Sequence, residues 1–325
     1  MKAVAFKKSD IQFVEVNNDK GLKVVFANLG AAIYSIRLDK YVLTRNVKDV
    51  EDFKKTEIYQ GKTIGRVSNR MKGKKFFLNN VIYEVENNEG PNTLHGGLSG
   101  LSTIFFESVT NEYKDRIEII YRHLSKHLEG GYPGNVRVEV KYVISKDEND
   151  IEVFYTATSD RDTILSLTNH TYFTLGCKSI HGLSLRINAD EYLETNVEDL
   201  LPLGRNEVDE VLDFRNLKPI TKDIENEKLQ VSRLRGYDHF FYLNKKEDNE
   251  IVLENRLIRM NIYTDFEGVQ IYTSGFDSGV PLYPECDYKY NSIAIEPSDS
   301  FEKLHLIKKD ITYMRRIKYS FTYKD

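Results

Sequence analysis

The sequence is poor in cysteine, and its first residues do not have the pattern of a secretion signal. Its 325 residues include only Cys177 and Cys286, too few to build the network of disulfides that stabilises small secreted domains. The two cysteines lack the short spacing of a zinc site, and the N-terminus "MKAVAFKKSDIQF" lacks the apolar core of a signal peptide. We therefore expect a cytoplasmic protein with reduced thiols.

Long hydrophobic runs and clusters of basic residues are also missing. No stretch approaches the roughly 18 apolar residues that cross a bilayer, so we expect no membrane association. The 46 basic residues are scattered and are balanced by 50 acidic ones, whereas proteins that bind nucleic acid concentrate positive charge on one face. The P-loop, the dinucleotide-binding glycine motif and the nucleophile elbow are absent, which disfavours nucleotide hydrolysis and esterase chemistry.

What the sequence does contain is material for strands. Hydrophobic residues make up 40% of the chain, with 21 Tyr and 17 Phe. In "VRVEVKYVI", residues 136–144, apolar side chains alternate with arginine, glutamate and lysine, the period-two pattern of a strand with one buried face. Similar β-prone runs recur at 116–124, 150–158, 240–244, 259–266, 269–276 and 319–325.

Turn-forming residues separate these runs. "LNNVIYEV" predicts a hairpin through Asn79 and Asn80, "KDEND" a polar turn, and "EGGYPGN" a longer loop. Only residues 50–60 and 229–234 suggest helices, and both would be short. No linker, fixed-period repeat or low-complexity segment divides the chain. The sequence therefore predicts an all-β sandwich of antiparallel sheets, with residues 1–325 in one domain.

Five stretches place hydrogen-bonding side chains in apolar or glycine-rich surroundings. Each has an ordinary explanation, such as a solvated loop or a hydrogen-bonded core histidine. Together they could line one mostly apolar cleft, the usual form of a ligand site. The residues are Arg66, Asn69 and Arg70 between Gly65 and Gly73; His95 before two glycines; Asn169 and His170 in "SLTNHTYFTL"; Asp238 and His239; and Glu296 after "IAI".

Two of these stretches make specific structural predictions. If residues 166–175 form a strand, Asn169 and His170 point to opposite faces, so only one of them can face a given pocket. Glu296 ends a buried strand, where loss of water should raise the pKa of its carboxyl group.

A metal site is the main rival to an acid–base site. His123 and His127 stand four residues apart, a helical ligand spacing, but the run that contains them is strand-like and no glutamate lies between them. We therefore expect no metal there.

Seven segments between residues 65 and 297 occur in a characteristic order: "GRVSNR", "GPNTLHGG", "EGGYPGNVRVEVKY", "LTNHTYFTLG", "LPLGRNEVDEVLDF", "YDHFFYL" and "IAIEP". Together they resemble the aldose 1-epimerase (galactose mutarotase) family. The resemblance implies a large antiparallel β-supersandwich with an open sugar-binding cleft. It also implies an isomerase that interconverts the α and β anomers of a free aldose, such as galactose or glucose, without cofactor or metal.

The resemblance also implies roles for individual residues. Glu296 matches the general base and His170 the general acid, while the groups that orient the sugar are His95, Arg70 and Asp238, with Asn69 and Asn169 in support. Anomer exchange opens the ring hemiacetal, which takes a proton from the anomeric hydroxyl and gives one to the ring oxygen. A carboxylate with a raised pKa can do the first and an imidazolium the second.

Two features leave the substrate open. The family commonly continues after the glutamate with Thr, Gln and a Pro-Asp turn, whereas Glu296 is followed by Pro297, Ser298 and Asp299. The chain has no tryptophan, so stacking on a sugar would fall to Tyr172 or Phe276. A hexose-6-phosphate 1-epimerase, which needs extra cations for the phosphate, and a non-catalytic carbohydrate-binding protein remain as alternatives. Monomer and homodimer are both compatible with the sequence.

Overall fold

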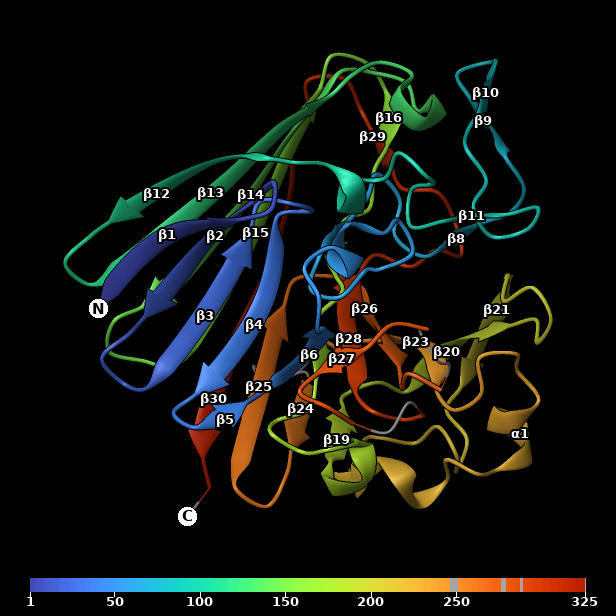
Figure 1. Ribbon diagram of the computed structural model, residues 1–325. Helices are drawn as coiled ribbons and strands as arrows, with labels where there is room; N and C mark the ends of the chain where they lie inside the picture. Colours follow the sequence, from blue (N-terminus) through green and yellow to red (C-terminus); the bar gives the residue numbers. More distant parts are fainter. Residues whose placement is uncertain (246–250, 276–278, 287–288, 325) are drawn as a thin grey trace.

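Antiparallel sheets make up most of the regular structure in the computed structural model, which describes residues 1–245, 251–275, 279–286 and 289–324 (Figure 1). The predicted all-β fold is confirmed. The helices among the described residues are short: η1 (Asp52–Lys54), η2 (Leu101–Thr103), η3 (Glu129–Gly131), η4 (Ile180–Gly182), η5 (Ile220–Lys222) and α1 (Glu227–Gln230).

The largest sheet has nine strands, and the expected alternation is visible in it. In β14 the side chains of the even-numbered residues from Val136 to Ile144 are buried, whereas the odd-numbered ones lie on the other, more exposed face. In spatial order the strands are β12 (Glu107–Glu112), β13 (Arg116–Ser125), β14 (Val136–Ser145), β15 (Asp150–Ser159), β30 (Tyr313–Tyr323), β25 (Ile258–Thr264), β24 (Ile251–Glu254), β19 (Ser184–Ile187) and β22 (Lys218–Pro219).

Two further sheets complete the main architecture. The five-stranded sheet runs in chain order through β1 (Lys2–Lys8), β2 (Ile11–Asn17), β3 (Leu22–Ala27), β4 (Ala32–Leu38) and β5 (Tyr41–Val42). The eight-stranded sheet has the order β21 (Pro202–Glu207), β20 (Glu191–Thr195), β23 (Asp238–Tyr242), β26 (Gly268–Tyr272), β28 (Ile293–Ser298), β18 (Tyr172–Phe173), β6 (Thr44–Val47) and β27 (Leu282–Tyr283).

Both of these sheets pack against the nine-stranded one. The rings of Phe26 in β3 and Tyr142 in β14 lie 4.7 Å apart, and those of Phe173 in β18 and Tyr319 in β30 lie 5.4 Å apart. One hydrophobic core contains buried residues of all three sheets, and Figure 1 shows β1–β5 layered over β12–β15. The result is the large antiparallel supersandwich that the sequence predicts.

Short ladders connect the sheets near the polar stretches. They are β7 (Thr63–Ile64) with β17 (Thr168–Asn169), β8 (Arg70–Met71) with β11 (Thr93–Leu94), β9 (Lys75–Leu78) with β10 (Val81–Glu84), and β16 (Thr163–Ile164) with β29 (Leu306–Ile307). The predicted hairpin is β9–β10, and Asn79 and Asn80 turn it with φ of 50° and 61°, the left-handed conformation that such turns require.

Both short helices that the sequence suggests are present: η1 lies within residues 50–60, and α1 overlaps the start of the segment 229–234. One local prediction needs correction. Residues 166–175 do not form one strand: β17 ends at Asn169, β18 begins at Tyr172, and each pairs with different partners. The backbone of His170 is therefore held outside a regular ladder.

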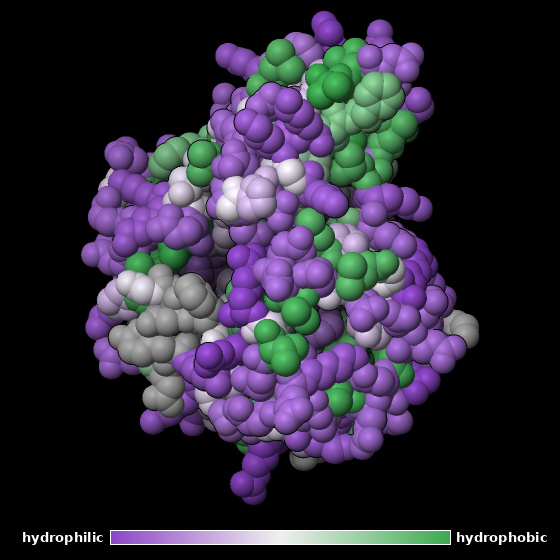
Figure 2. Space-filling view, turned by 90° about the vertical axis from the view of Figure 1, so that its right-hand side faces the viewer, coloured by the Kyte–Doolittle hydropathy of each residue, from purple (hydrophilic) through white to green (hydrophobic). Residues whose placement is uncertain are grey.

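The face that carries the β9–β10 hairpin is mostly hydrophilic, but hydrophobic side chains gather at its upper end (Figure 2). Phe77 and Ile82 are paired across the hairpin and are 66% and 67% exposed. Among the described residues, none of the helices has the length and hydrophobicity needed to cross a membrane.

Candidate active site

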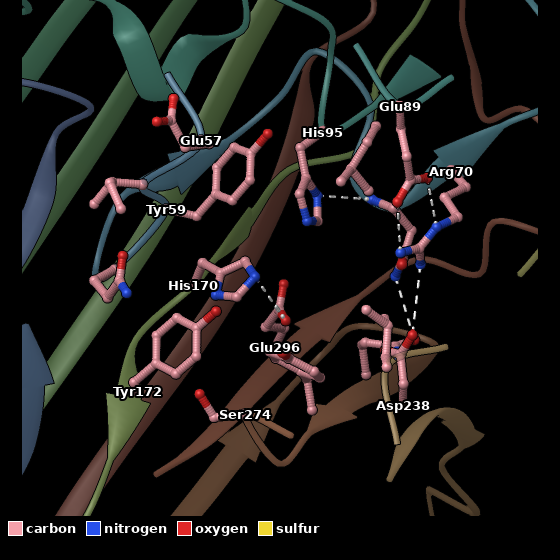
Figure 3. A pocket seen from close by; sticks show the side chains of 17 residues that line it. Glu57, Tyr59, Arg70, Glu89, His95, His170, Tyr172, Asp238, Ser274 and Glu296 are labelled. Atoms are coloured by element: carbon pink, nitrogen blue, oxygen red, sulfur yellow. Dashed lines mark hydrogen bonds and ion pairs between the residues drawn. The ribbon is translucent and has the colours of Figure 1, made fainter. Parts of the chain in front are cut away.

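A cavity of about 270 Å³ opens beside the eight-stranded sheet and collects the polar residues singled out above (Figure 3). Gln270 of β26 and Glu296 of β28 are directly paired in the register, so their side chains lie on the same face of the sheet. All six predicted site residues line this cavity: Asn69, Arg70, His95, His170, Asp238 and Glu296.

Glu296 is a buried carboxyl group on a buried strand. It is 2% exposed, and its Oε2 has no hydrogen-bond partner among the described residues. Burial raises its pKa well above the usual value, the nearby Asp238 carboxylate adds to the shift, and Arg70 opposes it. The direction of the pKa shift is as expected, but Glu296 lies inside β28 and not at the end of the strand, as the sequence had suggested.

The imidazole of His170 faces Glu296 from the segment between β17 and β18. Its Nε2 lies 3.3 Å from Oε1 of Glu296. Two backbone bonds anchor the residue: its N–H donates to Lys62 O at 3.0 Å, and its carbonyl accepts from Gly61 N–H at 2.9 Å. Burial lowers its pKa to about 3, and its Nδ1 has no partner among the described residues.

Asn169 supports this segment and does not line the cavity. Its side-chain amide donates to Gly61 O at 2.9 Å, and its Oδ1 accepts from the Thr171 N–H at 3.1 Å. Asn169 thus fixes the backbone on both sides of His170.

Burial shifts the pKa values of Glu296 and His170 in opposite directions. It raises the pKa of Glu296 and lowers that of His170, which favours the neutral pair with the proton on the carboxyl group. A pair in this state can still provide one acid and one base.

His95 is held in a single orientation by Asn69. The backbone N–H of His95 donates to the backbone carbonyl of Asn69 at 3.0 Å, and the ring Nδ1 of His95 accepts the backbone N–H of Asn69 at 3.2 Å. Burial lowers the pKa of His95 well below its usual value, with His170 and Arg70 adding to the shift. The neutral ring therefore carries its proton on Nε2 and can donate a hydrogen bond from that atom.

The far end of the cavity is an ion-pair network. Arg70 donates from Nε and Nη2 to the carboxylate of Glu89, at 2.8 and 3.1 Å, and its Nη1 lies 3.6 Å from Asp238 Oδ2. Gln270 connects this end to Asn69: it accepts from Asn69 Nδ2 at 3.3 Å and donates to Asp238 Oδ1 at 2.7 Å. These bonds hold the groups in place before any ligand arrives.

Residues 12–319 match the family model described as Aldose 1-epimerase. This chain belongs to the aldose 1-epimerase family. It is 31% identical to an aldose 1-epimerase of Haemophilus influenzae, over 88% of this chain and 85% of the relative. It is 30% identical to a galactose mutarotase of Sus scrofa, over 71% and 67%. These relationships make the protein an isomerase.

A solved structure shares the fold of this epimerase across its whole length. The crystal structure of galactose 1-epimerase from Lactobacillus acidophilus superposes with a TM-score of 0.90, covering 100% of this chain and 99% of the other at 24% identity.

One cluster of possible metal ligands in the cavity does not suit a metal ion. Ligand atoms of His95, His170 and Glu296 all lie within 4.8 Å of one another. However, Nδ1 of His95 already accepts the Asn69 N–H, so the lone pair needed for a metal would have to come from the protonated Nε2. Proton exchange is the chemistry that fits these groups.

Several singled-out residues lie outside the cavity. Arg66 is buried and donates to Ser125 Oγ at 2.9 Å and to Pro133 O at 2.7 Å, so it fixes a neighbouring loop. His239 follows Asp238 in β23 and therefore points to the opposite face. His123 lies beside Glu129, at 3.2 Å, whereas His127 accepts the Gly134 N–H.

The unusual residues after Glu296 have structural roles in this epimerase. The carbonyl of Pro297 accepts the Thr168 hydroxyl at 2.7 Å, and Asp299 Oδ1 accepts from Arg315 Nη2 at 2.8 Å. They tie β28 to its neighbours, and none of them lines the cavity.

Sequence reasoning missed other cavity residues, among them Tyr59, Glu89 and Gln270. Gln270 could have been found, because it is a polar residue inside the apolar run "GVQIY". Tyr59 carries no such signal. Of the two residues considered for sugar stacking, Tyr172 lines the cavity, while Phe276 lies outside the described residues.

Proposed function

We propose that this epimerase opens and recloses the ring of a free, uncharged aldose, with Glu296 as general base and His170 as general acid. The observation that carries the proposal is the 3.3 Å approach of His170 Nε2 to Glu296 Oε1 inside one buried cavity. Because the two groups lie within reach of each other in one cavity, one can accept a proton from the sugar while the other donates one.

In the proposed reaction the protons balance. Glu296 takes the proton of the anomeric hydroxyl while the bond from C1 to the ring oxygen breaks, and the ring oxygen receives a proton from the His170 imidazolium. The aldehyde then rotates about the bond from C1 to C2, and reclosure reverses both transfers. Burial favours the proton on Glu296 over His170, so this proton must move to His170 before ring opening.

The other polar groups would bind the sugar. The Nε2–H of His95 and the guanidinium of Arg70 would donate to sugar oxygens, and the Asp238 carboxylate would accept from hydroxyls. Asn69 would support two of these groups. Its backbone holds His95, and its side chain holds Asp238 through Gln270.

The charge of the cavity favours an uncharged substrate over a phosphorylated one. Among the described residues that line it, four are acidic, namely Glu57, Glu89, Asp238 and Glu296, and one is a basic residue, Arg70. Arg70 is already engaged by two carboxylates. A phosphate would need free cations, so we expect glucose to react faster than glucose 6-phosphate.

Polarimetry on freshly dissolved α-galactose and α-glucose tests the proposal. We expect the protein to accelerate the change in optical rotation well above the rate in buffer. The relatives named for galactose make galactose the first sugar to test. Calorimetric binding of a sugar without acceleration would instead indicate a carbohydrate-binding protein.

We also propose that the epimerase works in the cytoplasm. The chain has only two cysteines, Cys177 and Cys286, too few for a disulfide network, as expected of a protein from a reducing compartment. Sedimentation of the purified protein distinguishes the monomer from the homodimer, which the sequence leaves open.

A further inference from the structure

The imidazole of His170 lies between two tyrosine rings (Figure 3). Its ring centroid is 4.9 Å from that of Tyr172, with 24° between the planes, and 5.8 Å from that of Tyr59, with 22° between the planes. Both rings are thus nearly parallel to the imidazole and within about 6 Å, the range in which an aromatic face attracts a cation.

This arrangement meets a specific need of the proposed reaction. His170 is 4% exposed, and burial disfavours its charged form. Ring opening by a general acid nevertheless passes through the imidazolium. Each tyrosine presents the negative face of its π system to the imidazole. These faces attract the positive charge of the imidazolium at a position from which water is excluded.

We propose that Tyr59 and Tyr172 are positioning residues that clamp the His170 ring and stabilise its cationic form during proton transfer. This inference rests on the proposed function. The step is the transfer of the Glu296 carboxyl proton to a ring nitrogen of His170, which converts a neutral pair into a carboxylate and an imidazolium. No other reactant is needed.

Both tyrosines act through their rings. Burial raises the pKa of Tyr172 well above its usual value and that of Tyr59 to about 12, so neither phenol serves as a base near neutral pH. The two rings come from separate segments and are anchored independently. Asn88 Nδ2 donates to the Tyr59 hydroxyl at 3.5 Å, and Tyr172 lies in β18 between β6 and β28.

The charge balance around His170 includes groups from several elements. Its ring meets the edge of the His95 ring at a centroid distance of 5.3 Å. Other titratable groups surround His170, Tyr59 and Tyr172 in the cavity. They are Glu296 of β28, His95 of the loop after β11, Arg70 of β8, Asp238 of β23, Tyr272 of β26, and Glu57 and Glu89 of the loops.

The first test compares phenylalanine and leucine at each position. Tyr59→Phe and Tyr172→Phe retain the ring, so any fall in kcat should be clearly smaller than in the leucine variants. Tyr59→Leu and Tyr172→Leu remove it, and kcat should fall about tenfold for each ring, with a smaller change in KM. Because the cation is less stable without the ring, the acidic limb of the kcat profile should move to lower pH.

A purely structural role gives a different result. If the tyrosines only fill space, leucine would admit water, the imidazolium would become easier to form, and the acidic limb would move to higher pH. That direction, or a loss in the phenylalanine variants equal to that in the leucine variants, overturns the proposal. Tyr83→Leu is the matched control, because Tyr83 stacks on Phe76 at 5.5 Å outside the cavity.

Tyr172 is only 8% exposed, so its leucine variant could fail to fold. A second series keeps the shape of the ring: phenylalanine with one, two or three fluorines at position 172, each of which weakens the negative face. We expect kcat to fall with every added fluorine, and a flat series contradicts the proposal.

Histidine NMR separates this inference from the proposed function. If wild-type protein fails to accelerate anomer exchange, the proposed function is wrong. The imidazole signals of His170 still report whether removing a ring makes its cationic form harder to populate, and an unchanged titration overturns the inference alone.

Discussion

Glu296 and Lys62 are ionisable side chains buried inside the protein, and burial shifts their pKa values in opposite directions. Burial raises the pKa of Glu296, so its carboxyl group stays protonated to higher pH than in water. Burial lowers the pKa of Lys62, so its ammonium group loses its proton at lower pH than in water. Each shift means that the folded state prefers the neutral form. Each therefore predicts how stability changes with pH.

The variant Glu296→Gln should lose catalysis but remain folded. Glutamine cannot exchange protons, so we expect kcat to fall by about 10²- to 10⁴-fold, with a smaller effect on sugar binding by calorimetry. The unfolded carboxyl releases its proton near pH 4.5, while the folded one retains it to higher pH, so the wild type loses stability as pH rises above that value.

Thermal melts of Glu296→Gln and wild type should therefore coincide near pH 4, with the variant melting higher at pH 8. Equal activity of the two proteins would contradict the role of Glu296 as general base. Glu302→Gln, on the surface side of the same region, is a control for the loss of one negative charge.

Lys62 is 0% exposed, its Nζ has no hydrogen-bond partner among the described residues, and the ammonium lies 4.7 Å from the Phe53 ring. Burial lowers its pKa to about 7 from 10.5. Between these values the unfolded chain binds the proton and the folded one does not, so stability rises with pH across this window. Below about pH 7 the folded state bears the full penalty of a buried charge.

Lys62→Met should therefore stabilise the protein most at pH 6, by roughly 2–5 kcal/mol, and least at pH 10. Urea unfolding at the two pH values measures the difference. Lys72→Met, at an exposed position, should show no such pH dependence. If Lys62→Met is instead less stable than wild type at pH 6, the surroundings of Lys62 stabilise its ammonium group.

The sequence predicts a site residue when that residue differs in polarity from its neighbours along the chain. Glu296, Asp238 and His170 are polar groups within apolar or aromatic runs, and such contrast is readable because burying a polar group needs a reason. Tyr59 gives no contrast, since aromatic residues occur throughout the chain. Its contact with His170 joins segments more than a hundred residues apart, which no local pattern encodes.

At the scale of elements, local sequence patterns also failed to predict the break in the strand at residues 166–175. Alternation and β propensity predict extended backbone there, and the backbone is extended in β17 and β18. The partners of a strand, however, are set by tertiary packing: Asn169 pairs with Thr63 of β7, while Tyr172 pairs with Ala294 of β28. The break between them is where His170 turns toward the cavity.

The loop that carries His95 depends on close backbone contact. Gly96 has φ of 89°, and a Cβ on it would meet the carbonyl oxygen of Gly65. Gly90, in the turn before β11, has φ of 58° but open space around it. The two glycines thus separate the effect of backbone conformation from that of crowding.

Gly90→Ala should cost about 1–2 kcal/mol, the penalty for a left-handed alanine, and leave activity intact. Gly96→Ala should cost about 3 kcal/mol or more, because the clash adds to that penalty, and should also reduce kcat by displacing His95. Urea unfolding and polarimetry test both variants. Equal costs would mean that the loop relaxes away from Gly65.

At the scale of the whole molecule, the strands of the main sheets are interleaved along the chain. β30, the last strand, lies between β15 and β25 in the nine-stranded sheet. β6, from the N-terminal part, lies between β18 and β27 in the eight-stranded sheet. Such long-range pairing could not be read from the sequence, which predicted the strands but not their order.

We propose, from this interleaving, that the chain is one domain that unfolds as a unit. A cut between β6 and β30 would separate strands that pair within one sheet, and a cut after β5 would detach the five-stranded sheet and expose the core that all three main sheets share. Urea unfolding followed by far-ultraviolet circular dichroism and by tyrosine fluorescence should therefore give one transition with the same midpoint for both signals. Two separated transitions would show that the five-stranded sheet, β1–β5, unfolds independently of the cavity, and activity would then be lost only in the second.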